Sequence, residues 1–183
     1  MSDTGKELLL SSLTSYYSKN EDNKIILKDI IESKHQLSLR MIDYLVTDYA
    51  KYNNIIYWTS IDNDNIYYNL PEGNALKYKK ITLYLDYRAQ LKSFKKINFD
   101  AFRRHDRITF IIDPIKQVSI ETTIGQLNFF KWAFSNKIIK FAIENQKSIY
   151  DSMSKNTHVS KDKKKMIMHR QDIINTKCFV SFD

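Results

Sequence analysis

Residues 123–152 read TIGQLNFFKWAFSNKIIKFAIENQKSIYDS. Apolar side chains recur in this stretch at helical spacing, and additional aromatic residues widen the apolar stripe beyond one face. Thr123 has a hydroxyl suited to cap the first turn. The stretch therefore predicts one long helix over about 124–152. Because it is apolar on several sides, such a helix must be buried against more than one other element.

The sequence before this helix contains both helical and strand-like patterns. Residues 5–19 and 39–52 have apolar residues three and four apart, and Ser38 is a candidate N-cap for the second of these helices. Residues 24–33 fit either a short helix or a strand, and residues 88–96 fit a short helix. β-prone runs bounded by turn residues predict strands at 55–59, 66–70, 81–87, 107–113 and 117–122.

These elements predict an α+β fold with a helical N-terminal part, a small and mainly antiparallel sheet, one long buried C-terminal helix and a basic tail. The chain has 183 residues, of which 43% are hydrophobic, and this suits one domain with a sizeable core. We expect that domain at 1–153. Residues 154–183 are expected to form a basic, flexible tail that ends in a β-prone segment at 178–182.

Targeting and redox signals are sparse. Cys178 is the only cysteine, so no internal disulfide can form, which fits a reducing compartment. The first residues lack the pattern of a signal peptide, and no apolar run approaches the ~20 residues of a transmembrane helix. The sequence thus predicts no membrane span. It gives no indication of the oligomeric state.

Positive charge is concentrated in the second half of the chain. Residues 1–80 carry 10 Lys and Arg against 11 Asp and Glu, whereas residues 81–183 carry 19 against 10. Localised positive charge attracts polyanions. The Lys-rich and Ile-rich composition is also typical of an AT-rich genome, so part of the excess can reflect codon bias.

The first basic block lies between residues 88 and 107. Tyr84, Tyr87, Phe94, Phe99 and Phe102 are interleaved with its cations. Cations that neutralise phosphates and rings that stack on bases together suit a nucleic-acid surface. Equally, the rings could be core and the cations a solvated face paired with nearby carboxylates. The predicted phosphate contacts are Arg88, Lys92, Lys95, Lys96, Arg103, Arg104 and Arg107.

A second basic block lies in the predicted tail. Its cations are Lys161, Lys163, Lys164 and Lys165, with Asp162 among them. A basic arm can clamp a phosphate backbone without sequence preference. A solubilising tail and a nuclear-localisation address are the alternatives.

Catalytic and metal-binding signals are weak. The four histidines are scattered without metal-ligand spacing, and His105 beside Asp106 lacks a nucleophile context. Asp62 and Asp64 resemble the start of a calcium loop, but the glycine and the distal glutamate are missing, so they predict a turn. We therefore expect no enzymatic activity, no cofactor and no metal ion.

Several stretches of the sequence are notable together: LRMIDYLVTDYAK at 39–51, YRAQLKSF at 87–94, FDAFRRHDRI at 99–108, TIGQLNFFKWA at 123–133 and VSFD at 180–183. In this order they resemble a family of small uncharacterised proteins of nucleocytoplasmic large DNA viruses, the giant viruses. The matching stretches run from about residue 39 to the C-terminus. The resemblance implies a viral protein that acts in the infected cytoplasm, at the viral factory, or is packaged in the virion, and it supplies no catalytic residues.

Three functional hypotheses follow. The first is a non-enzymatic module that binds nucleic acid through phosphate contacts, independently of sequence. The second is a structural or adaptor protein of a viral assembly that binds an acidic protein partner. The third and weakest is an enzyme whose site is assembled from residues distant in sequence, around Arg103 and His105.

Overall fold

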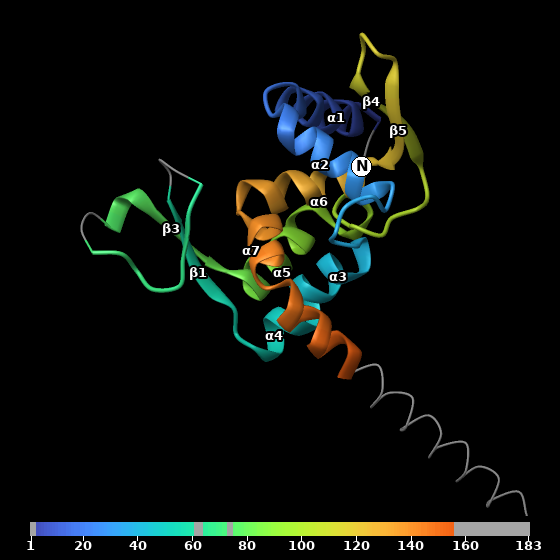
Figure 1. Cartoon of the computed structure of the whole chain (residues 1–183). Helices are drawn as coiled ribbons and strands as arrows, with labels where there is room; N and C mark the ends of the chain where they lie inside the picture. The colour runs from blue at the N-terminus through green and yellow to red at the C-terminus, as the bar shows by residue number, and fades with distance from the viewer. Residues whose placement is uncertain (1–2, 61–63, 73–74, 156–183) are drawn as a thin grey trace, which may run out of the picture.

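The structure is a computed structural model that describes residues 3–60, 64–72 and 75–155. Helices and small antiparallel sheets alternate along the chain, so the expected α+β class is confirmed (Figure 1). The β4–β5 hairpin lies beside α1 and α2 at one end of the molecule, and the sheet that contains β1 and β3 lies on the other side of α6 and α7. No helix within the described ranges is both long and apolar enough to cross a bilayer.

The N-terminal part is helical, as predicted. Helix α1 spans Asp3–Ser18 and α2 spans Glu21–Ile31, which settles the ambiguous segment as a helix. A further helical run consists of α3 (Leu39–Tyr44), a π-helical turn η1 (Leu45–Tyr49) and α4 (Ala50–Tyr52). The Ser38 hydroxyl accepts a hydrogen bond from the Met41 amide at 3.1 Å, so Ser38 is the predicted N-cap.

The strands form two separate antiparallel sheets. In the first, β1 (Ile56–Ser60) lies between β2 (Ile66–Tyr67) and β3 (Tyr78–Thr82). The second is a hairpin of β4 (Arg107–Asp113) and β5 (Val118–Thr123), in which Phe110 faces Ile120. Both buried side chains point to the side covered by the helices, and this face joins the hairpin to the core.

The strand predicted at 81–87 is wrong beyond Thr82. Helix α5 begins at Leu83 and continues to Phe94, with a short 3₁₀ turn η3 (Lys96–Asn98) after it. Ile81, Leu83 and Leu85 alternate in sequence, as in a strand. However, Leu83 and Tyr87, which are four residues apart, are both buried, whereas Leu85 between them is 63% exposed. Burial at a spacing of four residues is typical of a helix. The Asp86 carboxylate accepts a hydrogen bond from the Thr82 amide at 2.9 Å and so holds the start of this helix.

The single long helix predicted over 124–152 is interrupted. Helix α6 spans Ile124–Ser135, α7 spans Ile138–Glu144, and residues 146–155 are helical after one turn residue. Thr123 caps α6 as predicted, because its hydroxyl accepts from the Gln126 amide at 3.1 Å. Lys137, between α6 and α7, has a left-handed backbone with φ of 58°.

The break between α6 and α7 is stabilised by the buried Asn136. Its side-chain amide donates to the Trp132 carbonyl at 2.8 Å, and its side-chain oxygen accepts from Lys79 Nζ at 2.7 Å. Its backbone carbonyl accepts from the Tyr57 hydroxyl at 2.8 Å. An asparagine that bonds neighbouring backbone groups competes with helical hydrogen bonding, and contacts with the first sheet reinforce the turn.

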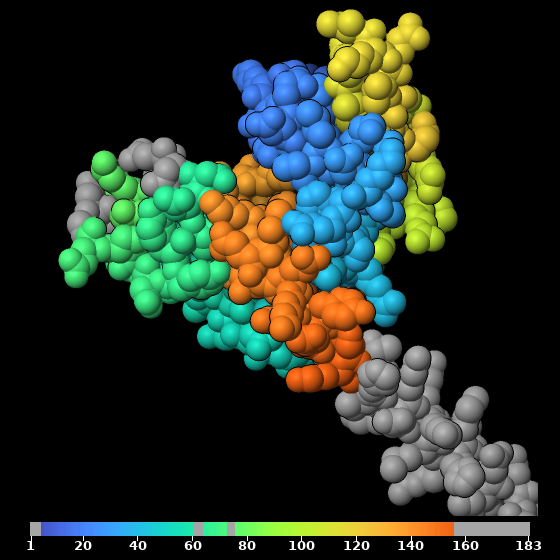
Figure 2. All heavy atoms as spheres, in the orientation of Figure 1, coloured from blue at the N-terminus to red at the C-terminus, as the bar shows by residue number. Residues whose placement is uncertain are grey.

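Helix α6 is the centre of the core. Every residue from Gly125 to Phe134 except Lys131 is buried, and the apolar side chains from Leu127 onward belong to one core cluster. The helix packs against α1, α7 and η3. The Tyr17 hydroxyl of α1 donates to the Leu127 carbonyl at 2.9 Å, and the Tyr57 ring of β1 stacks on Phe141 of α7 at 5.1 Å. Figure 2 shows α7 and residues 146–155, in orange, filling the space between the first sheet and the N-terminal helices.

Candidate anion-binding site

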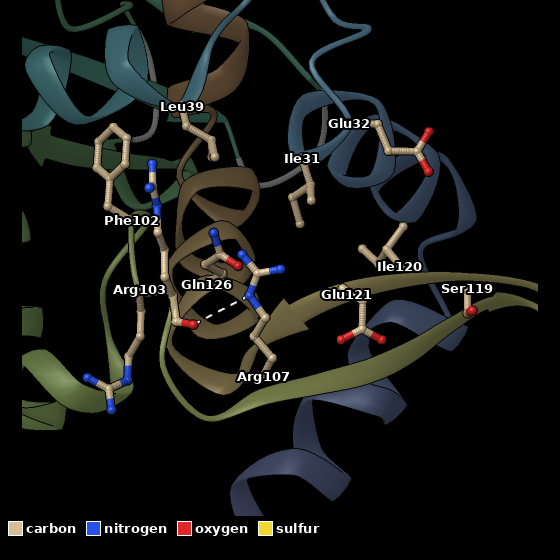
Figure 3. A pocket seen from close by; sticks show the side chains of 11 residues that line it. Ile31, Glu32, Leu39, Phe102, Arg103, Arg107, Ser119, Ile120, Glu121 and Gln126 are labelled. Carbon is tan, nitrogen blue, oxygen red and sulfur yellow. Dashed lines mark hydrogen bonds between the residues drawn. The ribbon is translucent and has the colours of Figure 1, made fainter.

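A pocket of about 350 Å³ opens where the loop 99–106 enters β4. Its walls come from the end of α2, the start of α3, both strands of the hairpin and the first turn of α6 (Figure 3). No one of these elements forms the site alone. The lining residues are Ile31, Glu32, Leu39, Phe102, Arg103, Arg104, Arg107, Ser119, Ile120, Glu121 and Gln126.

The first turn of α6 holds the loop in place. The Gln126 side-chain amide donates to the Ala101 carbonyl at 2.9 Å, and its oxygen accepts from the Thr122 hydroxyl at 3.1 Å. The Asp100 amide donates to the Gly125 carbonyl at 3.2 Å. A Cβ at Gly125 would lie 3.1 Å from the Ile97 carbonyl oxygen, so glycine permits this close approach. The loop is thus fixed by buried hydrogen bonds.

The three predicted arginines of this region have different environments. Arg103 forms an ion pair with Asp106 at 2.6 Å, and this hydrogen bond lowers the pKa of the Asp106 carboxyl. Figure 3 shows its guanidinium pointing away from that of Arg107. Arg104 and Arg107 are exposed and pair with no carboxylate in the part of the chain that the structure describes. Arg107 Nε donates to the Arg104 carbonyl at 3.4 Å, which engages one of the guanidinium donors and leaves the terminal NH groups available.

Two glutamates also line the pocket. Glu32 pairs with Lys34 at 2.6 Å and with Lys28 at 3.2 Å, and hydrogen bonds from these lysines lower its pKa. Glu121 accepts a hydrogen bond from the Thr109 hydroxyl across the hairpin at 2.7 Å. The negative charge of Glu32 is therefore neutralised by these two lysines, whereas Glu121 has no cationic partner among the described residues. The two unpaired arginines leave the pocket cationic.

Four of the five rings interleaved with the first basic block belong to the core. Tyr87 and Phe99 are buried, Phe94 stacks on Phe99 at 6.1 Å, and Tyr84 packs against the same cluster. For these four, the alternative interpretation as core residues is correct. Phe102 differs, because it is only half-buried and lines the pocket.

The remaining cations of the first block do not share one helix. Arg88 and Lys92 are exposed on α5, which ends at Phe94, and Lys95 and Lys96 follow it as exposed residues. None of the four side chains forms an ion pair with a carboxylate within the described ranges. No hydrogen bond or ion pair among those residues links them to Arg103, Arg104 or Arg107.

The predicted cations of the second block, Lys161, Lys163, Lys164 and Lys165, lie outside the described residues, as does the β-prone segment 178–182. Among the residues described, no group of three or more His, Cys, Asp or Glu side chains could hold a metal ion.

Sequence reasoning did not identify the pocket residues that lie outside the basic block. Ile31, Leu39, Glu121 and Gln126 carry no local signal that links them to the arginines, since they are brought there only by packing of α2, α3, β5 and α6. Thr123 was predicted as an N-cap, and it marks the point where β5 ends and α6 begins. Because Thr123 pairs with Arg107 across the hairpin, this cap was the one local signal beside the arginines.

These features describe a small α+β protein with an arginine-lined pocket. The chain belongs to the DUF7197 family, a family of unknown function whose model matches residues 2–178. It is also similar to uncharacterized protein L507 of Acanthamoeba polyphaga mimivirus, with 30% identity over 165 residues. This match covers 88% of the chain and 59% of the mimivirus protein, so the chain spans less than two thirds of that relative. No solved structure matches the chain.

The resemblance to uncharacterised giant-virus proteins is thereby confirmed.

Proposed function

We propose that this viral protein binds nucleic acid without enzymatic activity and largely independently of sequence, in the infected cytoplasm or in the virion. Arg104 and Arg107 contact phosphates at the pocket. The exposed cations Arg88, Lys92, Lys95 and Lys96 add contacts along the strand, and Lys161, Lys163, Lys164 and Lys165 act as a basic arm. Arg103 positions the loop through its ion pair with Asp106.

The observation that carries the proposal is the pair of unpaired arginines at one pocket. Arg104 and Arg107 are exposed, and no described carboxylate neutralises them. Guanidinium groups bind phosphate oxygens through two parallel hydrogen bonds, and they retain their charge at any physiological pH. The hydrogen bond from Arg107 to the Arg104 carbonyl restricts one of the two side chains before a ligand arrives.

The test is the salt dependence of binding to a labelled oligonucleotide, followed by fluorescence anisotropy. Each phosphate contact adds roughly 0.9 to the slope of log affinity against log salt on duplex DNA, and roughly 0.7 on a single strand. We expect the double variant Arg104→Gln and Arg107→Gln to bind more weakly and to have a slope smaller by about 1.4–1.8.

A matched control removes the same charge elsewhere. Lys19 and Lys147 are exposed lysines away from the pocket, so Lys19→Gln with Lys147→Gln should leave the slope close to that of the wild type. A flat salt response of the wild-type protein would exclude phosphate binding. A stoichiometric complex with an acidic protein that survives nuclease and high salt would instead favour the adaptor function.

A further inference from the structure

We infer that the pocket receives one unpaired nucleotide, so that the protein prefers single-stranded nucleic acid to duplex. This inference rests on the proposed function and names the form of nucleic acid that the same site takes. Phosphate contacts alone do not predict it, because duplex DNA has the higher charge density and would be favoured by an unstructured cationic surface.

The size of the pocket suits a single nucleotide. Its volume of about 350 Å³ is at the lower end of the ~300–1,000 Å³ range of small-molecule sites. A base that remains paired inside a duplex cannot enter such a cavity without being flipped out, which costs unstacking and unpairing free energy. A base of a single strand enters without breaking a pair.

One wall of the pocket offers a surface on which a base can stack. The half-buried Phe102 has none of the ring partners that occupy Phe94 and Phe99, within the described part of the chain. Figure 3 shows Phe102 near Leu39 at one edge of the pocket, with Ile31 and Ile120 on the opposite side. Aromatic rings with an exposed face stack on bases irrespective of their identity.

Polar groups line another wall of the pocket. Arg107 extends from β4 toward the interior, with Gln126 behind it and Glu121 on the neighbouring strand (Figure 3). The Gln126 amide is already bonded to Ala101 and Thr122, so it shapes the wall and has little capacity for a ligand. Glu121 retains acceptor capacity beyond its bond from Thr109, and carboxylates accept hydrogen bonds from exocyclic base amines.

The charges around the pocket are consistent with one bound phosphate. Arg103 is compensated by Asp106, and Glu32 by Lys28 and Lys34. What remains is Arg104 and Arg107 against Glu121, a net charge of one positive unit. This residual charge attracts a single phosphate to the pocket, while the apolar wall accommodates its base.

The experiment compares one labelled oligonucleotide as a single strand and annealed to its complement, in both DNA and RNA form, because both sugars present the same base faces and phosphates. We expect the wild-type protein to bind the single strand at least ~10-fold more tightly. Phe102→Ala should lose about 5- to 150-fold in single-strand affinity, the range for one base–aromatic stack, and retain its duplex affinity. Phe102→Tyr, which keeps the ring, should restore the preference.

Tyr52→Ala is the matched control, because Tyr52 is an exposed ring remote from the pocket. Its melting temperature and that of Phe102→Ala, compared with the wild type, separate loss of stacking from loss of fold. A steep salt response with equal or stronger duplex binding in both sugars would overturn this inference and leave the proposed function intact. Unchanged single-strand affinity in Phe102→Ala would overturn it as well. Absence of binding to every probe would overturn both.

Discussion

Phe99 and Phe102 are three residues apart and have opposite environments. Phe99 is fully buried, with its ring 5.5 Å from Phe129 and 5.4 Å from Trp132, whereas Phe102 is half-buried at the pocket. The loop that carries both is irregular, so no helical or strand period distinguishes a core ring from a surface ring. Only the docking of the loop on α6 determines that Phe99 packs inward and Phe102 lines the cavity.

Asp43 lies in an unfavourable electrostatic environment. Burial raises the pKa of its carboxyl, Asp100 raises it further, and Lys96 partly opposes the shift. In the folded state this carboxyl therefore holds its proton more tightly than in the unfolded chain, so its contribution to stability increases as the pH falls through the raised pKa. At neutral pH the ionised form destabilises the fold.

Replacement of Asp43 by the neutral isostere removes this unfavourable term. We expect Asp43→Asn to raise the melting temperature at pH 7, and the difference from the wild type should shrink in acid, where Asp43 is protonated in both states. Melting curves between neutral and acidic pH measure this directly. The exposed Asp151→Asn provides the control and should show no comparable gain. A lower melting temperature for Asp43→Asn at pH 7 would contradict the assignment.

At the scale of elements, capping residues were the most reliable local signals. Ser38 and Thr123 start helices where predicted, because a hydroxyl that accepts an amide hydrogen bond acts within one turn of chain. The two strands at 107–113 and 117–122 were also predicted, and the structure pairs them as the β4–β5 hairpin around Pro114. The prediction of a strand over 81–87 was wrong because three alternating aliphatic residues are too few to distinguish the two-residue period of a strand from the 3.6-residue period of a helix. Burial of Leu83 and Tyr87 in the core favoured the helix.

The end of helix α5 is strained. Lys95 follows Phe94 with φ of 62° and ψ of 154°, a region of backbone conformation that almost only glycine occupies. A side chain held there destabilises a protein by about 1–3 kcal/mol. The neighbouring Lys96 has no such conformation and begins the η3 turn.

This contrast defines a matched pair of glycine variants. We expect Lys95→Gly to raise the free energy of unfolding by roughly 1 kcal/mol, because the relief of strain exceeds the added entropy of the unfolded chain. Lys96→Gly should lower it by about 0.5–1 kcal/mol, as glycine does in an ordinary helical position. Urea unfolding of the two variants measures both values. Destabilisation by Lys95→Gly as large as that by Lys96→Gly would show that the backbone at residue 95 is not strained.

At the scale of the whole molecule, one apolar cluster runs from Leu13 in α1 to Ile149. The first sheet joins it through Tyr57, which is buried and bonded to Asn136. Such continuity predicts that the described part of the chain unfolds as one cooperative unit, in keeping with the single domain expected at 1–153.

The two tryptophans allow this prediction to be tested. Trp58 lies in β1 and Trp132 in α6, so Trp132→Phe leaves a probe in the sheet and Trp58→Phe leaves a probe in the core. In each variant we expect the fluorescence midpoint in urea to coincide with the midpoint from far-ultraviolet circular dichroism. A Trp58 midpoint at clearly lower urea than the circular dichroism midpoint would mean that the sheet unfolds separately.

The sequence by itself determined the fold class, the helix starts at Ser38 and Thr123, the strands at 107–113 and 117–122 and the location of the excess positive charge, because each depends on residues close together in the chain. Tertiary structure alone decided that the C-terminal helix breaks at Asn136, that four rings of the basic block are core, and that Phe102 shares a pocket with Arg104 and Arg107. These outcomes depend on contacts between elements far apart in sequence, such as Tyr57 with Asn136 and Gln126 with Ala101, whose geometry no local pattern encodes.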